Sequence, residues 1–333
     1  MTAVESRLDQ YGKAVRTAVE HLLATEPRYD GLYGMLRYHL GWLESNDGGP
    51  GKQLRPAICL LVAEAVGGDW RPAVPVATAV ELLHNFSLIH DDIQDGSHMR
   101  RHREALWSVW GLAQGVNAGD ALLILAEQAI LEATPPMDPA LALGSVRRLN
   151  AACRRLCEGQ YLDLLWEDQP TIELDEYLEM IAGKTAALFR CAAELGAYSV
   201  GANPALQEAF ALGLAFQAAD DVLGVWGPAD QTGKTSDLDV ANRKKTLPVV
   251  IGLSAPDSPM ANRLRELFAQ DRQLTPDGTA EATAVLDQLG VRPEAERLAR
   301  GFRDEAIGVI EAAGLGERSE PLLEFTRAVV PEM

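Results

Sequence analysis

Three carboxylates stand within five residues of the segment "SLIHDDIQD", at Asp91, Asp92 and Asp95. On a helix with about 100° per residue, Asp91 and Asp95 point within about 40° of each other, and Asp92 lies beside them. Exposed carboxylates at this spacing repel by about 0.2–0.5 kcal/mol per pair. Oxygen ligands of this kind suit Mg²⁺, which keeps several bound waters and is usually also coordinated by substrate phosphates. A lone motif of this length is equally compatible with a solvated helix end.

A second acidic cluster favours the metal interpretation. The segment "FQAADDVLG" places Asp220 and Asp221 on another Ala-rich helical stretch, with Gln217 one turn earlier. Two acidic ends of otherwise apolar helices could face one another across a cavity, and Mg²⁺ between them would bridge a diphosphate. Gly224 occupies the position at which a third carboxylate would complete this second cluster.

Basic side chains accompany both clusters. Arg100 and Arg101 follow the first cluster directly, and a Gly/Pro turn precedes Lys52 and Arg55 in "GPGKQLRP". The others are Lys184 in "AGKTAALF", Lys234 in "QTGKTS", and Lys244 and Lys245 in "NRKKTLP". Singly, each is typical of a surface charge, but Arg and Lys near helix N-termini are what phosphate binding uses. The sequence therefore predicts metal at the acidic clusters and anions at the basic ones.

A nucleotide P-loop is a poor alternative for "GPADQTGKT". Pro228 stands where the first glycine of the motif belongs, and the preceding segment is helical. The strand–loop–helix context that a P-loop requires is absent from the pattern.

Long Ala- and Leu-rich segments with helical periodicity dominate the 333 residues, of which 47% are hydrophobic. Pro/Gly turns separate them, and neither a strand hairpin nor a βαβ rhythm is predicted. The short segment "LPVVIGL" favours a buried helix over an isolated strand. No linker or repeat marks a boundary, so we expect one all-α domain over 1–333, built from about ten to a dozen helices.

Charge and cysteine content bound the partners. The formal net charge is −18, which makes nucleic acid a poor partner. No uninterrupted apolar stretch reaches the 18 or so residues of a membrane span, and the N-terminus lacks the apolar core of a signal peptide. The four cysteines are scattered through apolar helical patterns, as expected for reduced thiols. We expect a cytoplasmic protein without integral membrane association.

Taken in order, the motifs resemble the polyprenyl synthetase family of trans-isoprenyl diphosphate synthases, which includes geranylgeranyl and farnesyl diphosphate synthases. The resemblance rests on "GKQLRP", "ELLHNFSLIHDDIQD", "RR", "NAGD", "EGQYLDL", "GKTAALF", "FQAADDVLG", "GK" and "KKTLP". It implies a transferase of isoprenoid biosynthesis that joins isopentenyl diphosphate to an allylic diphosphate. It also implies a homodimer of all-α isoprenoid synthase-type bundles, with three Mg²⁺ ions in a central cavity.

The resemblance carries roles to individual residues. Asp91, Asp95 and Asp220 are similar to the Mg²⁺ ligands, with Asp92 and Asp221 as supports. The pocket for isopentenyl diphosphate is expected at Lys52, Arg55, His84 and Arg101. Contacts to the allylic diphosphate are expected from Arg100, Lys184, Lys234 and Lys244. Thr185 and Gln217, with Lys184, resemble the groups beside the reacting carbons.

Product length is expected to depend on Phe86 and Ser87, which precede Asp91 by five and four residues. An aromatic residue at the Phe86 position, without an insertion in the motif, resembles the floor of archaeal-type geranylgeranyl diphosphate synthases. Small Ser87 leaves room that a second aromatic residue would close. A C20 product is therefore expected, with a C15 or a longer product as the alternative.

The sequence also departs from the family pattern. The arginine pair is followed by "HREALW" instead of the usual glycine and proline–threonine, "GPGK" replaces a double glycine before lysine, and Gly224 replaces an aspartate. A class I terpene cyclase is the main rival function, but it would have no use for a pocket holding isopentenyl diphosphate. A non-catalytic subunit of a heteromeric synthase would be expected to have lost the acidic motifs, which this chain keeps.

Overall fold

The computed structural model of the protein describes residues 3–24, 29–41, 51, 53–167, 169–202, 210–227, 238–270 and 273–330. Lys52 and Lys234, two of the predicted site residues, lie outside the described residues. The chain divides into two compact units. Unit 1 comprises Met1–Cys153, Leu188–Gln207 and Ala313–Glu324, and unit 2 comprises Arg154–Ala187, Glu208–Ala312 and Phe325–Met333. One domain over the whole chain stays a prediction.

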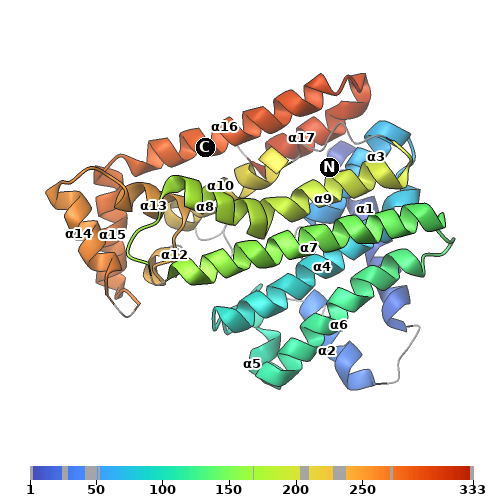
Figure 1. Cartoon of the computed structure of the whole chain (residues 1–333), viewed down its shortest axis with the longest axis horizontal. Helices are drawn as coiled ribbons and strands as arrows, with labels where there is room; N and C mark the ends of the chain where they lie inside the picture. Colours follow the sequence, from blue (N-terminus) through green and yellow to red (C-terminus); the bar gives the residue numbers. More distant parts are fainter. Residues whose placement is uncertain are drawn as a thin grey trace. The chain divides into compact units, whose positions relative to one another are not determined.

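Over the residues that the structure describes, the regular elements of unit 1 are helices and one short hairpin. Its elements are α1 (Ala3–Ala24), α2 (Asp30–Leu40), α3 (Leu54–Gly67), the 3₁₀ turn η1 (Arg71–Ala73), α4 (Val74–Gln94), α5 (Leu106–Trp110), α6 (Leu112–Leu131), the first half of α7 (Pro139–Glu167), most of α9 (Ala187–Ser199) and the 3₁₀ turn η4 (Gly316–Ser319). Helix α4 packs against α1, α3 and α6, and Figure 1 shows α4 and α6 running side by side. Helix α4 therefore forms the core of this unit.

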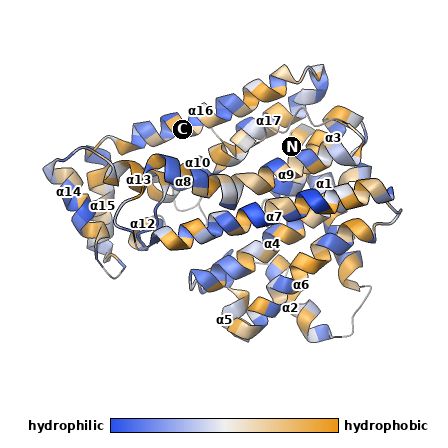
Figure 2. Cartoon of the chain, viewed as in Figure 1, coloured by the Kyte–Doolittle hydropathy of each residue, from blue (hydrophilic) through white to orange (hydrophobic). Residues whose placement is uncertain are grey.

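The apolar surface of α4 explains its central position. Most of its residues from Val76 to Phe86 are buried, and burying each large aliphatic side chain contributes about 1.5–3 kcal/mol. In Figure 2 the hydrophobic colour of α4 gives way to a hydrophilic colour at its C-terminal end, where Asp91, Asp92 and Asp95 lie. The segment Arg71–Gln94 is long and apolar enough to span a membrane. However, 67% of its apolar stretch is buried inside the structure, as is common for a core helix.

A two-stranded antiparallel hairpin follows α4, where no hairpin is predicted from the sequence. Strand β1 (Met99–Arg100) pairs with β2 (Arg103–Glu104), and the turn residues Arg101 and His102 have φ angles of 50° and 63°. Positive φ at both central residues defines a type I′ turn, for which Asn-Gly is the usual signature. Because Arg-His carries no such signature, the sequence-based expectation was wrong at this point.

Unit 2 is all-helical over its described residues. Its elements are the second half of α7, α8 (Leu174–Ile181), the π-helical turn η2 (Ala182–Ala186), α10 (Phe210–Trp226), α12 (Leu238–Ala241), α13 (Leu247–Leu253), α14 (Pro259–Phe268), α15 (Pro276–Gln288) and α16 (Val291–Ala312). The last helix, α17 (Glu320–Val329), contributes residues to both units. The segment "LPVVIGL" forms α13, as predicted.

Helix α10 holds the core of unit 2 and packs against η2, α13 and α16. Ala218 and Val222 of α10 meet Leu247 of α13 and Ala299 of α16 in one buried cluster. Small Ala residues on the α10 face allow the neighbouring backbones to approach closely. The all-α prediction is confirmed in both units.

Candidate active site

The acidic cluster lies at the C-terminal end of α4, where the helix dipole is unfavourable to it. Asp91 and Asp92 lie in its last turn and Asp95 is its C-cap, where the negative end of the dipole disfavours carboxylates. Arg100 of β1 compensates, because its Nε lies 2.9 Å from each carboxylate oxygen of Asp92 and its Nη2 lies 2.6 Å from Asp92 Oδ1. The Asp92 side chain is 2% exposed, whereas that of Asp91 is 22% exposed. Asp92 therefore belongs to the scaffold, and Asp91 is the more accessible carboxylate.

Two predicted anion-binding residues of unit 1 touch each other. Arg55, the second residue of α3, places Nη1 3.2 Å from His84 Nε2 on α4. Since arginine can only donate, His84 Nε2 accepts and the imidazole is neutral. Burial lowers the pKa of His84 well below its usual value, and Arg55 and Arg101 lower it further. The ring of Phe189 lies 4.6 Å from the Arg55 guanidinium carbon and supports it from the apolar side.

Arg101 is positioned by the hairpin turn and by one glycine. Gly51 has a φ of 72°, and a Cβ built there would lie 2.9 Å from the guanidinium carbon of Arg101. Any side chain at position 51 would therefore both strain the backbone and displace the guanidinium. The predicted pocket residues Arg55, His84 and Arg101 all lie in unit 1.

A buried polar group on α4 was missed by the sequence analysis. Asn85 is fully buried, and its Nδ2 donates to Glu81 O at 2.8 Å and to Glu81 Oε1 at 2.9 Å. Burial raises the pKa of Glu81, against the opposing influence of Arg101 and Arg55. The available signal was a glutamate inside an apolar helix, because such a residue is retained in a core only where charge or hydrogen bonding compensates it.

The predicted chain-length residues also lie on α4. Phe86 is buried, and its ring contacts that of His90 edge-on with centroids 4.8 Å apart. His90 in turn lies against α6, where a Cβ added to Gly119 would overlap His90 Nε2. Ser87 donates its hydroxyl to His84 O at 2.8 Å. Phe86 is thus fixed through His90 against a close approach of α6.

In unit 2, three predicted residues form one hydrogen-bonded chain. Thr185 Oγ1 lies 2.7 Å from Gln217 Oε1, and Gln217 Nε2 lies 2.8 Å from Asp221 Oδ1. Asp221 Oδ2 accepts from the Tyr177 hydroxyl at 2.6 Å and from the Leu247 amide at 2.7 Å. Burial raises the pKa of Asp221 to about 7, although these three donors pull it down. Tyr177 was not among the predicted residues.

The two adjacent carboxylates of α10 have different environments. Asp220 is exposed, whereas Asp221 is 5% exposed, because successive helical residues point about 100° apart. One turn further along, a Cβ added to Gly224 would lie 3.1 Å from Asp239 Oδ2 on α12. The place where the family usually has a third aspartate is therefore next to the carboxylate of Asp239, which the sequence analysis did not identify.

Lys184 lies in the π-helical turn η2, and its Nζ lies 2.5 Å from Asp163 Oδ2 on α7. Asp163 belongs to the motif "EGQYLDL", but the sequence predicts no role for this residue. A π turn leaves the regular hydrogen-bond pattern and is frequent at functional sites. Lys244 lies between α12 and α13, with its amide donating to Asp239 O at 2.9 Å.

The π turn is packed directly on the backbone of α7. A Cβ added to Gly159 would overlap the Lys184 amide nitrogen, and one added to Gly183 would lie 2.7 Å from Arg155 O. Neither contact involves a flexible side-chain end, so no local adjustment relieves it. Glycine at both positions is what allows η2 to bring Lys184 towards Asp163 and Thr185 towards Gln217.

We expect Gly159→Ala to lower the free energy of unfolding by about 1–3 kcal/mol or more, the range for overpacking a tight site. Gly308→Ala on α16 is the matched control, because nothing lies within 4 Å of its added Cβ. That control should gain about 0.5–1 kcal/mol from helix propensity. Urea unfolding of the three proteins measures both, and equal stability of the two variants would contradict the close contact.

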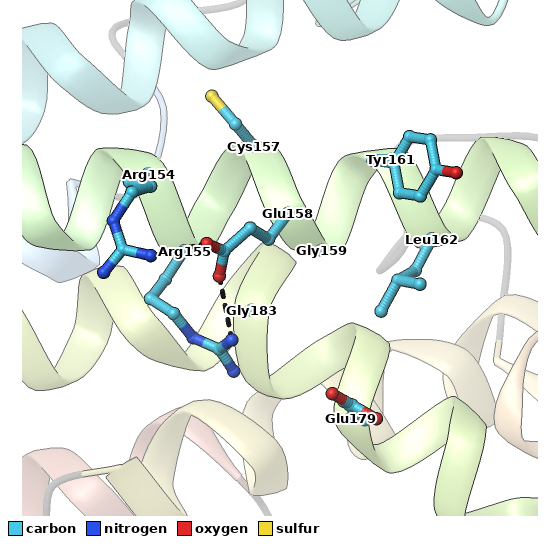
Figure 3. A pocket seen from close by; sticks show the side chains of 9 residues that line it. All are labelled: Arg154, Arg155, Cys157, Glu158, Gly159, Tyr161, Leu162, Glu179 and Gly183. Atoms are coloured by element: carbon cyan, nitrogen blue, oxygen red, sulfur yellow. Dashed lines mark hydrogen bonds and ion pairs between the residues drawn. The ribbon is translucent and has the colours of Figure 1, made fainter.

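A pocket of about 490 Å³ opens beside this contact, lined by Arg154, Arg155, Cys157, Glu158, Gly159, Tyr161, Leu162, Glu179 and Gly183. In Figure 3 most of the lining side chains project from α7, and Arg155 and Glu158 pair with each other. Of the predicted substrate and metal residues that the structure describes, none lines this pocket. The residues that line it are therefore not those to which the sequence assigns chemistry.

The donor set fits divalent metal in one particular mode. Among the described residues, no group of three or more His, Cys, Asp or Glu side chains is close enough to hold a metal ion. Mg²⁺, however, usually takes one or two protein carboxylates and completes its shell with water and substrate phosphates. In each acidic cluster one carboxylate is already engaged by the protein, Asp92 by Arg100 and Asp221 by Tyr177. Their neighbours Asp91 and Asp220 therefore suit this mode of metal binding.

The fold defines an all-α protein whose acidic helix ends are accompanied by basic side chains, and comparison with known proteins gives its family. The sequence model named "Polyprenyl synthetase" matches residues 41–285. The chain is 41% identical to a geranylgeranyl diphosphate synthase of Mycobacterium tuberculosis over 315 residues, covering 92% of this chain and 88% of the relative. It is 38% identical to a (2E,6E)-farnesyl diphosphate synthase of Mycobacterium bovis over 297 residues, covering 85% and 81%.

Solved structures agree with the sequence comparison. A polyprenyl synthetase from Streptomyces coelicolor A3(2) superposes with a TM-score of 0.87 at 35% identity, covering 97% of this chain and 99% of that one. A polyprenyl synthase from Caulobacter crescentus CB15, complexed with calcium and isoprenyl diphosphate, has a TM-score of 0.81 at 30% identity, covering 99% and 98%. The chain belongs to the polyprenyl synthetase family and is a prenyltransferase.

Proposed function

We propose that this protein condenses isopentenyl diphosphate with an allylic diphosphate in a Mg²⁺-dependent reaction and stops mainly at geranylgeranyl diphosphate. The observation that carries the proposal is the cationic group of unit 1, in which Arg55 contacts a neutral His84 beside Arg101. An elongating enzyme needs such a group for its second diphosphate substrate. A class I terpene cyclase does not need it, so this cationic group favours elongation.

The reaction breaks the allylic C–O bond and joins the allylic carbon to the double bond of isopentenyl diphosphate, which then loses a proton. We assign to Lys184, whose ammonium group is held by Asp163, the neutralisation of charge on the departing diphosphate. Thr185 and Gln217 would lie beside the allylic cation. The departing diphosphate takes the proton, so no side-chain base is required. Bound Mg²⁺, three ions by family resemblance, would supply Lewis-acid stabilisation of the same leaving group.

The experiment is a product assay with purified protein, labelled isopentenyl diphosphate and either dimethylallyl, geranyl or farnesyl diphosphate. We expect dephosphorylated C20 alcohol from all three primers with Mg²⁺ and none with a chelator. The alternative of a farnesyl diphosphate synthase would leave C15 as the end product and would not extend farnesyl diphosphate. A cyclase would release hydrocarbon from geranylgeranyl diphosphate without consuming isopentenyl diphosphate.

Arg101→Ala should raise KM for isopentenyl diphosphate by about 10–100-fold, the equivalent of one charge-assisted hydrogen bond. Its KM for the allylic substrate should change much less, since the guanidinium is assigned to the other diphosphate. Arg297→Ala is the charge-matched control, because Arg297 pairs with Glu294 on the exposed surface of α16. An equal increase in both KM values for Arg101→Ala would contradict the assignment.

We also propose that the protein forms a homodimer through α6. Leu112, Ile124 and Leu131 of this helix are each more than half exposed, which is unusual for leucine and isoleucine on one helix. A second copy would cover them. Light scattering at several concentrations should give twice the monomer mass, and Ile124→Glu should shift the mass towards the monomer. A cytoplasmic location is proposed too, supported by the scatter of the four cysteines through apolar helical segments, which is typical of reduced thiols.

A further inference from the structure

The hydrogen bonds around Asp221 point to a role other than metal support. This carboxylate accepts at both oxygens, from Tyr177 and the Leu247 amide at Oδ2 and from Gln217 Nε2 at Oδ1. It comes from the same acidic motif as Asp220, but Asp220 is exposed and Asp221 is buried. Its oxygens are thus directed towards protein donors in the core of unit 2.

The partners of Asp221 decide how Gln217 is oriented. The ionised Asp221 carboxylate can only accept, so the group of Gln217 that faces Oδ1 at 2.8 Å must be the NH₂. The amide oxygen of Gln217 then faces Thr185, whose Oγ1 lies 2.7 Å away. Because that oxygen can only accept, the Thr185 hydroxyl must donate its proton to Gln217. On the side away from Gln217, the Thr185 oxygen therefore presents a lone pair.

We propose that Asp221 is a positioning residue that fixes the polarity of the Gln217–Thr185 pair, so that the Thr185 oxygen presents a lone pair to the reacting allylic carbon. The inference rests on the proposed function, since it assumes a cationic allylic carbon beside Thr185. A lone pair stabilises developing positive charge there, whereas a hydroxyl proton in the same place opposes it.

The rigidity of the pair follows from where Asp221 is held. Tyr177 lies on α8 and is 1% exposed, and the Leu247 amide is the first N–H of α13. The Leu247 N–H lies 2.7 Å from Asp221 Oδ2, and a hydrogen bond donated to a carboxylate favours its ionised form against the effect of burial. Residues of α8 and α13 therefore hold the one side chain that selects the orientation of Gln217.

Asp221→Asn is the informative change, because it keeps the shape and alters only the donor pattern. The new amide oxygen would replace Oδ2, since Leu247 N–H cannot accept. The new NH₂ would then face Gln217, whose amide must turn over to present its oxygen. Gln217 would donate to Thr185, and the Thr185 hydroxyl proton would point towards the substrate.

We expect Asp221→Asn to lower kcat by about 10²-fold, the scale for losing one preorganised electrostatic contact, with little change in either KM. The double variant Asp221→Asn, Gln217→Glu should recover at least about tenfold of that loss, because the new carboxylate at position 217 accepts from both neighbours and restores the polarity at unchanged total charge. In a Thr185→Val background, Asp221→Asn should have little further effect.

Binding measurements separate this role from metal binding. Mn²⁺ titration with inorganic diphosphate, followed by electron paramagnetic resonance, should give the same affinity for wild type and Asp221→Asn and a weaker one for Asp220→Asn. Asp287→Asn is the matched control for kcat and melting temperature, since Asp287 accepts one hydrogen bond from Trp226 at 2.9 Å in the same unit.

Loss of Mn²⁺ affinity in Asp221→Asn, or no recovery in a folded double variant, would overturn the positioning role. Absence of isopentenyl transfer by the wild-type protein would instead reject the proposed function, whatever the variants do. An Asp221→Asn protein with wild-type kcat would show that the orientation of Gln217 is set by other groups, and would also reject the inference.

Discussion

Asp91→Ala is expected to lower kcat by about 10²-fold or more, the scale on which enzymes lose a main electrostatic stabiliser. The physical reason is its place at the negative end of α4 with a partly exposed carboxylate. There the helix dipole and neighbouring aspartates disfavour negative charge until a cation binds. Asp95→Ala should behave in the same way. Steady-state turnover with saturating substrates and varied Mg²⁺ measures the effect.

Asp92→Ala should show that Asp92 stabilises the fold, in contrast to the catalytic role expected for Asp91. The Asp92 side chain is 2% exposed and pairs with Arg100 at 2.6 Å, so its loss leaves a largely buried guanidinium without its carboxylate. Breaking one side of such a pair costs roughly 3 kcal/mol of stability. We therefore expect lower stability in Asp92→Ala and near-normal stability in Asp91→Ala, as judged by urea unfolding.

Asp9→Ala is the control for all three aspartate variants, because Asp9 forms an exposed i, i+4 pair with Lys13 on α1. It should alter neither kcat nor stability by more than the few tenths of a kcal/mol of such pairs. Near-normal turnover of both Asp91→Ala and Asp95→Ala would reject the metal assignment at α4.

The fold was predictable because helical periodicity and the Pro/Gly turns act locally. The segment "LPVVIGL" was assigned correctly as a helix, α13, because no second strand is predicted with which it could pair. The hairpin after α4 was not, since the positive φ angles of Arg101 and His102 are imposed by surrounding contacts, with Arg101 packed on Gly51. No residue type in the turn signals that conformation.

The sequence identifies the types of the candidate site residues, but not their partners. Asp91 and Asp92 are adjacent carboxylates of one motif, yet Arg100 pairs closely with Asp92 and holds it in the scaffold. In the same way, α10 places Asp220 outside and Asp221 against Tyr177, which the sequence separates by 44 residues. Long-range partners such as Tyr177 and Asp239 have no local pattern, so only the folded chain identifies them.

Helix α4 also carries the residues that should set product length. Phe86, Leu83, Leu82 and Ala79 precede Asp91 on this helix and are all fully or nearly fully buried. Ser87 lies four residues before Asp91, which places it one turn, about 5.4 Å, below the carboxylate. A tail growing from the metal site along α4 would meet Ser87 first and Phe86 next.

Ser87→Phe should therefore shorten the main product from C20 to C15, because a phenyl ring would occupy the space one turn below Asp91. Its expected signature is a loss of activity with farnesyl diphosphate as primer while dimethylallyl diphosphate is still extended. The measurement is chromatography of the dephosphorylated products. An unchanged C20 product would show that the tail does not pass this side of α4.

Phe86→Ala should lengthen the product beyond C20, because removing the ring that contacts His90 edge-on at 4.8 Å would open space on α4 for a longer tail. Truncating a buried phenylalanine also costs about 3–5 kcal/mol of stability, so products are to be compared well below the melting temperature of the variant. Phe268→Ala is the matched control, since Phe268 is equally buried but lies in the core of unit 2. It should lose similar stability and keep the C20 product. A longer product from both variants would mean that loosened packing, and not the floor at Phe86, sets the chain length.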